Sequence, residues 1–125
     1  KKVQDIGDIL MGIPEYRAAK ENLVGPRIIS GNPQREVGKI LVEMTGGTEG
    51  PRGVFDKLYK VGVRTLICMH LSEEHFKKVK DANLNVVIAG HISSDTLGLN
   101  LLLDNVEKEE KLDIIECSGY RRVRR

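Results

Sequence analysis

The stretch that decides the fold is residues 63–95, "VRTLICMHLSEEHFKKVKDANLNVVIAGHISSD". It contains two apolar runs, Val63–Met69 and Leu84–Ala89, with the length and β-branched content of buried strands. Between them, Ser72–Asn83 has helix signals, with Ser72 as N-cap and acidic residues in the first turn. A strand–helix–strand unit of this kind predicts a parallel sheet covered by helices.

The same alternation continues on both sides of this unit. Upstream, Val37–Met44 is a predicted strand, Thr45–Gly50 is a glycine-rich loop, and Pro51–Gly62 is a helix that starts with proline and ends with glycine. Downstream, the pattern predicts a long helix over Ser93–Glu110 and a fourth strand over Leu112–Cys117. The repeated alternation predicts an α/β layered domain, with a mainly parallel sheet of four to five strands flanked by helices.

The first third of the chain is a lead-in to this core. Apolar spacing predicts a helix over Val3–Met11, a second short helix over Glu15–Asn22 and a short strand at Arg27–Ser30. We therefore expect one domain of 125 residues, with residues 1–36 as the lead-in and 37–125 as the core.

Composition excludes several classes of protein. Hydrophobic residues make up 40% of the chain, charged residues 30% and aromatic residues 4%, and the net charge is +2. This small charge predicts neither a nucleic-acid nor a membrane partner, and the basic tail "YRRVRR" is expected to be solvated. Cys68 and Cys117 lie in apolar runs, which favours buried reduced thiols and a cytoplasmic location, although the sequence leaves a disulfide open.

Three strand exits carry polar groups, and in a parallel sheet these exits meet at one edge, where ligands bind. After the third strand, His91 and Asp95 are four residues apart and would share a helix face. Imidazole and carboxylate ligands suit Zn, Mn or Fe. The alternative is a helix capped by Ser93, Ser94 or Asp95, and spacing alone favours that capped turn.

The other two exits carry weaker signals. His70 leaves the second strand and is either a metal ligand, a proton-transfer group or without a role, whereas His75 is expected to be a solvated helix residue. At the first exit, Thr45, Gly46, Gly47 and Thr48 precede a helix. They form either a cradle for an anionic cofactor or substrate, or a tight turn without a ligand.

The runs "GKILVEMTGGTEG", "MHLSEEH" and "GHISSDTLGLNLLLD", with the ending "IIECSGYRRVRR", resemble one protein family. These are the dinuclear-metal-centre proteins, also known as NGG-interacting-factor-like proteins or GTP cyclohydrolase type 2 homologues. The resemblance covers nearly the whole chain, is close from Val37 onward, and matches the family's C-terminal lobe.

The resemblance implies a two-lobed α/β protein that assembles into homo-oligomeric rings and holds two metal ions between its lobes. It implies that His91 and Asp95 are metal ligands, with Asp95 standing where the family usually has Glu. The family's other ligands, including a His-His pair, belong to the N-terminal lobe, and the histidines here are only 70, 75 and 91. We expect the chain, which opens without Met, to be one lobe of a longer protein.

Two functions follow from this resemblance. One is hydrolase-like chemistry on a small phosphorylated or heterocyclic substrate, with His91 and Asp95 binding metal and His70 acting as a catalytic group. The other is a non-catalytic module for oligomerisation or partner binding.

Overall fold

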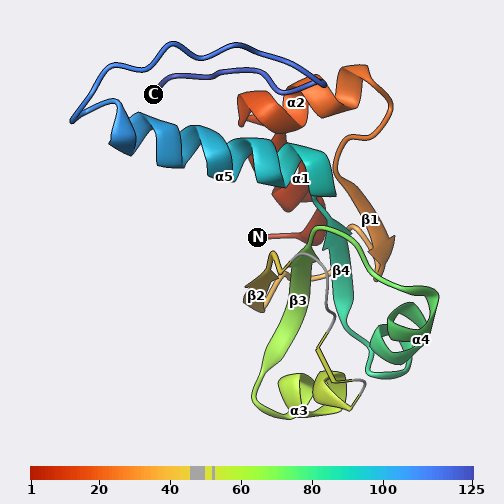
Figure 1. The fold of residues 1–125 in the computed structure, drawn as a ribbon. Helices are drawn as coiled ribbons and strands as arrows, with labels where there is room; N and C mark the ends of the chain where they lie inside the picture. Colours follow the sequence, from red (N-terminus) through yellow and green to blue (C-terminus); the bar gives the residue numbers. More distant parts are fainter. Residues whose placement is uncertain (46–49, 52) are drawn as a thin grey trace.

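Helices and strands alternate along the part of the chain that the structure describes, which is residues 1–45, 50–51 and 53–125. In the computed structural model the elements are α1 (Val3–Met11), α2 (Pro14–Glu21), β1 (Arg27–Ser30), β2 (Lys39–Glu43), α3 (Val54–Lys60), β3 (Val63–Cys68), α4 (Glu73–Asp81), β4 (Asn85–Ile88) and α5 (His91–Val106) (Figure 1). The predicted α/β class is confirmed.

The strands form one mixed sheet in the order β1-β4-β3-β2. Strands β2, β3 and β4 are parallel, and β1 pairs with β4 in the antiparallel direction. The register of the central pair places Thr65 opposite Asn85 and Ile67 opposite Val87. Both central strands are buried on their two faces, which explains why their sequences are almost continuously apolar.

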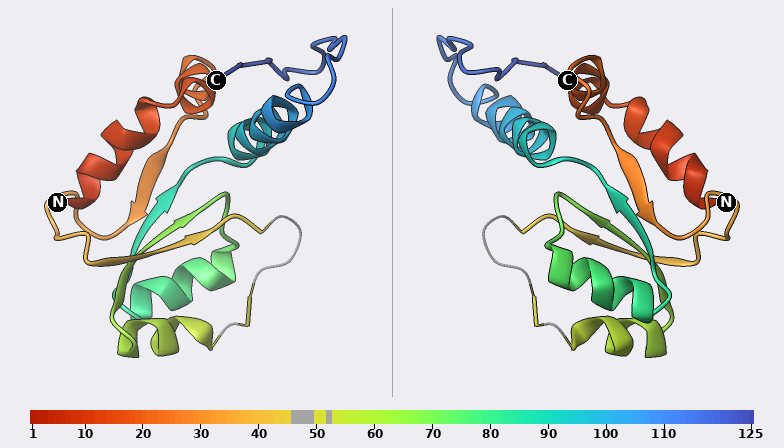
Figure 2. Two further views of the ribbon diagram at one scale, coloured as in Figure 1. Left: turned by 90° about the vertical axis from the view of Figure 1, so that its left-hand side faces the viewer. Right: turned by 90° about the vertical axis from the view of Figure 1, so that its right-hand side faces the viewer.

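Helices cover both faces of the sheet. Helices α1, α2 and α5 lie on one side, and α3 and α4 lie on the other (Figure 2). Successive strand residues point to opposite faces, so Ile67 and Val87 pack in the α1 core while Leu66 and Val86 pack in the α3–α4 core. Within the first group, α1 contacts the sheet, and α2 and α5 pack against each other.

Local sequence accounts for the buried face of α1 and for the start of α4. In α1 the residues Val3, Ile6 and Leu10 are buried, which is the helical spacing of its apolar positions. Helix α4 begins after Ser72, whose hydroxyl oxygen accepts a hydrogen bond from the His75 N–H at 3.2 Å.

The predicted strand over Leu112–Cys117 is wrong. This segment runs above α5, on the side away from the sheet, so no strand lies beside it to complete a ladder (Figure 1). Leu112 and Ile114 are half-buried while Ile115 is 86% exposed, so the alternating pattern survives without strand pairing. Cys117 is exposed rather than buried, whereas Cys68 is buried as predicted.

No helix in the described part of the chain is long and apolar enough to cross a membrane.

Candidate metal centre

The ends of β3 and β4 bring the candidate ligands to one edge of the sheet. The two strands stay paired to their last residues, where the Ala89 N–H donates to the Cys68 carbonyl at 2.8 Å. His70 follows β3 after one residue, and His91 is the first residue of α5. Parallel pairing therefore places two histidines side by side although they are far apart in the chain.

The turn into α5 requires glycine at position 90. Gly90 has a φ of 104°, in the region that favours glycine, and an added Cβ would lie 2.8 Å from the Ser93 hydroxyl oxygen. Gly90 is also the N-cap of α5, and no side chain caps this helix. Instead, the Ser94 hydroxyl donates to the Gly90 carbonyl at 2.5 Å and lies 3.0 Å from the Tyr16 hydroxyl. The helix therefore starts before the serines, two residues earlier than predicted.

Because the helix begins at His91, this residue and Asp95 lie one turn apart on the same face. The Nε2 of His91 is 3.3 Å from the Oδ2 of Asp95, and their side chains are 46% and 62% exposed. The imidazole rings of His70 and His91 are stacked, with centroids 5.1 Å apart and an interplanar angle of 23°. The three side chains form one cluster that is open to solvent.

The distance between the donors of His91 and Asp95 is compatible with a shared metal ion. Zinc lies about 2.0–2.2 Å from nitrogen and oxygen ligands, and tetrahedral geometry then separates two such donors by about 3.4 Å. The observed 3.3 Å fits this value. Among the described residues, however, no three His, Cys, Asp or Glu side chains are grouped so as to hold a metal. His70 is stacked on His91 and does not complete the set.

His75 is not the solvated helix residue that the sequence predicted. It is 7% exposed, and its ring meets the Phe55 ring edge-on with centroids 5.5 Å apart. Its Nε2 lies 2.8 Å from the Gly50 carbonyl, and its Nδ1 lies 2.8 Å from the Ser72 hydroxyl. A carbonyl can only accept, so Nε2 carries a proton and donates to it. His75 therefore ties α4 to the segment that precedes α3.

The predicted anion cradle falls mostly outside the described residues. Gly46, Gly47 and Thr48 belong to the undescribed part of the chain. Thr45 is described, and its backbone N–H donates to Oε1 of Glu43 at 2.7 Å. The choice between an anion cradle and a tight turn therefore stays a prediction.

The C-terminal residues 111–125, termed the strap, fold back over α2 and α5 (Figure 1). The strap reverses at Ser118 and Gly119, whose φ values of 52° and 84° are both positive. The Tyr120 N–H closes this turn by donating to the Cys117 carbonyl at 2.9 Å. Positive φ at both central positions is typical of the tight turns that reverse a hairpin.

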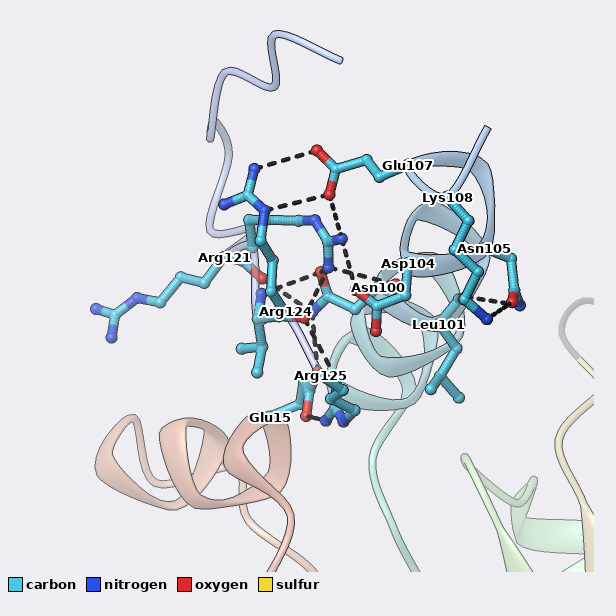
Figure 3. Close-up of polar contacts among 12 residues, drawn as sticks. Glu15, Asn100, Leu101, Asp104, Asn105, Glu107, Lys108, Arg121, Arg124 and Arg125 are labelled. Carbon is cyan, nitrogen blue, oxygen red and sulfur yellow. Dashed lines mark hydrogen bonds and ion pairs between the residues drawn. The ribbon is translucent and has the colours of Figure 1, made fainter. Parts of the chain in front are cut away.

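Asn100, in the middle of α5, is fully buried and joins three elements (Figure 3). Its Nδ2 donates to Oε1 of Glu15 at 2.9 Å and to the Arg121 carbonyl at 3.0 Å. Its Oδ1 accepts from the Tyr120 hydroxyl at 2.7 Å and from the Val123 N–H at 3.2 Å. The sequence signal for this role is a single amide inside the apolar run "LGLNLLLD".

Charged groups reinforce the strap, so the expectation of a solvated basic tail fails for Arg122, although Arg121 and Arg124 are exposed. The Arg122 side chain is 3% exposed, and its Nη2 donates to Asp104 at 2.6 Å and to Glu107 at 2.7 Å. Arg125 donates through Nη2 to Oε2 of Glu15 at 2.5 Å. These pairs bind the strap to α5 and α2, and so help to orient the helix that carries the candidate ligands.

The strap arginines also change the acidity of their partners. Burial alone would raise the pKa of Glu15, but hydrogen bonds from Arg125 and Asn100 outweigh it and lower this pKa below 4.5, its ordinary value. Hydrogen bonds from Arg124 and Arg122 likewise lower the pKa of Glu107. Both carboxylates are therefore held in the charged form that the strap needs.

Comparison with known proteins identifies the fold. A NIF3 superfamily protein from Sphaerobacter thermophilus has a crystal structure that matches 87% of this chain, with a TM-score of 0.70 and 28% sequence identity. The fold of this chain is therefore similar to that of a NIF3 superfamily protein. The chain spans 39% of the length of that relative. No family model matches the sequence. No curated protein matches it significantly.

The NIF3-like fold agrees with the resemblance found in the sequence runs around His70 and His91.

Proposed function

We propose that this NIF3-like chain is the metal-binding lobe of a protein with a dinuclear metal centre. His91 and Asp95 are its ligands for divalent Zn, Mn or Fe, and the remaining ligands come from a second, N-terminal lobe. The observation that carries this proposal is the 3.3 Å distance between His91 Nε2 and Asp95 Oδ2 at an open sheet edge. The two side chains are exposed, so a second lobe can supply further ligands from outside.

The chemistry proposed for the assembled site is hydrolysis of a small phosphorylated or heterocyclic substrate. Divalent ions bound there would supply Lewis acidity and a water molecule of lowered pKa. In this proposal His91 and Asp95 hold the site at the end of β4, and His70, whose ring stacks on that of His91, is the proton-transfer group. By itself the chain offers two ligands, whereas catalytic zinc commonly has three from the protein. We therefore expect the isolated chain to bind metal weakly and to be inactive.

Calorimetric titration of the chain with Zn²⁺ and Mn²⁺ tests the ligand assignment. The substitutions His91→Ala and Asp95→Asn should each weaken metal binding more than about tenfold, because each removes a direct ligand.

Glu73→Gln is a matched control, because this exposed carboxylate pairs with Lys77 on α4 and lies outside the cluster. It should leave the metal affinity unchanged. His70→Ala should lower the affinity less than His91→Ala does. Equal affinity of the wild-type chain and His91→Ala would contradict the metal-site proposal.

A second candidate function is a non-catalytic module for oligomerisation or partner binding. An apolar groove of about 640 Å³ between the sheet and α5 favours it. This β2–α5 groove is lined by Val42, Met44, Ile67, Met69, Leu97, Leu99 and Leu101, among others. Val42 is 59% exposed, and Leu101 is 45% exposed. Open apolar surface of this kind is common where protein chains meet.

A further inference from the structure

A second pocket lies between α2, the first turns of α5 and the strap. Its volume is about 570 Å³, within the range of roughly 300–1,000 Å³ that is usual for small-molecule sites. The strap forms one wall through residues on both sides of its turn, including Ser118 and Val123. His91 also lines it, so this strap pocket borders the candidate metal centre.

Much of the strap pocket is lined by aliphatic side chains, beside polar residues such as Thr96 and Ser118. Pro14, Ala18 and Ala19 line it from α2, Ile92 from α5 and Val123 from the strap. No Phe or Tyr side chain occurs among the described residues that line it. Such side chains favour a ligand with an aliphatic part.

One charge at the strap pocket is left without a partner. The Glu15 carboxylate is bound by Asn100 and Arg125. The guanidinium of Arg121, in contrast, makes no hydrogen bond or ion pair with any described residue, and it points away from the strap network (Figure 3). The pocket therefore combines an aliphatic interior with an unpaired cation, to which an anionic group is complementary.

We propose that the strap pocket binds a small aliphatic carboxylic acid. Its carboxylate pairs with the Arg121 guanidinium, and its hydrocarbon chain packs against Ala18, Ile92 and Val123. This inference goes beyond the proposed function, because binding of the acid requires no metal. It gives the NIF3-like chain a ligand site next to His91 that can be measured separately.

Titration of the ¹⁵N-labelled chain with octanoate in metal-free buffer tests the proposal by NMR. Octanoate should shift the amide signals of Ala18, Ile92 and Val123 in a saturable way. The neutral analogue 1-octanol should bind more weakly, because it cannot pair with Arg121. Arg121→Gln should weaken octanoate binding roughly tenfold and leave octanol binding unchanged. Arg124→Gln is the matched control, since that strap arginine pairs with Glu107 and does not line the pocket.

A second variant tests occupancy of the pocket without changing its charge. Ala18→Leu adds a larger side chain inside the pocket, on a helix that tolerates leucine, and should abolish octanoate binding without loss of folding. Shifts confined to the β2–α5 groove, or equal octanoate affinity in Arg121→Gln, would overturn the proposal. The metal titration tests a different site. A chain that binds Zn²⁺ but not octanoate would reject only this inference. A chain that binds octanoate but not Zn²⁺ would reject only the metal site.

Discussion

At the residue scale, Asn100 makes the largest number of polar connections between distant parts of the chain. It bonds Glu15 in α2 and four strap residues, although it has no exposed surface. A buried amide of this kind stabilises the fold only while all its partners are satisfied. Its removal leaves the partners buried without hydrogen bonds.

Asn100→Leu should therefore lower the free energy of unfolding by about 3 kcal/mol, since several buried polar groups lose their partners at once. Urea denaturation followed by circular dichroism measures this. Asn105→Leu on the same helix is the control, because Asn105 is exposed and bonds only within the helix and to Lys108. It should change stability by less than about 0.5 kcal/mol. An equal loss of unfolding free energy in the two variants would show that the buried hydrogen bonds of Asn100 do not stabilise the fold.

His75 shows why single residues are hard to predict. Its place on the predicted helix indicated a solvated side chain. Its burial depends on Phe55 and the Gly50 carbonyl, which lie 20 and 25 residues earlier in the sequence. No local pattern contains that information, because the contact forms only when α3 and α4 pack side by side.

At the element scale, ionised carboxylates help to hold the strap on α2 and α5. The pKa values of Glu15 and Glu107 are both lowered in the folded chain. Their contribution to stability is therefore complete above the ordinary pKa of 4.5 and is lost as the pH falls through the lower folded values. The arginine partners stay charged throughout, so protonation of the carboxylates alone weakens the pairs.

The strap should therefore detach below about pH 4.5, before the sheet unfolds. Amide exchange measured by NMR should show faster exchange at Tyr120 and Val123 as the pH falls, while Leu66 and Val86 stay protected. Glu107→Gln should give fast strap exchange already at neutral pH, because it removes the charge that binds two arginines. Strap and sheet amides that lose protection together would contradict this order of events.

At the scale of the whole molecule, the β2–α5 groove leaves apolar surface open on one side of the sheet. Helix α1 covers β1 and β4, but the side chains of Val42 and Leu101 stay exposed. Contact between two copies of the chain would bury this surface and supply the hydrophobic energy that an interface needs. The groove is therefore the surface through which we propose that oligomers form.

Leu101→Glu should shift the chain towards the monomer in sedimentation velocity, because it places a charge in the groove. The control is Leu23→Glu, which removes an equal side chain at a position that is 95% exposed and outside the groove. That variant should sediment like the wild-type chain. A monomeric wild-type chain, or equal sedimentation of the two variants, would count against the groove as an interface.

The sequence by itself determined the helices, the strands of the sheet and the α/β class. Apolar periodicity and cap residues act within a few positions, so α1 and β1 have the predicted bounds. Proximity of His70 and His91 could also be inferred, because parallel strands end at one edge. Only the tertiary structure decided that His75 is buried, that Leu112–Cys117 finds no strand partner, and that the basic tail folds onto Asn100. These outcomes depend on residues far apart in the chain, because burial and ion pairing are decided by which elements pack together.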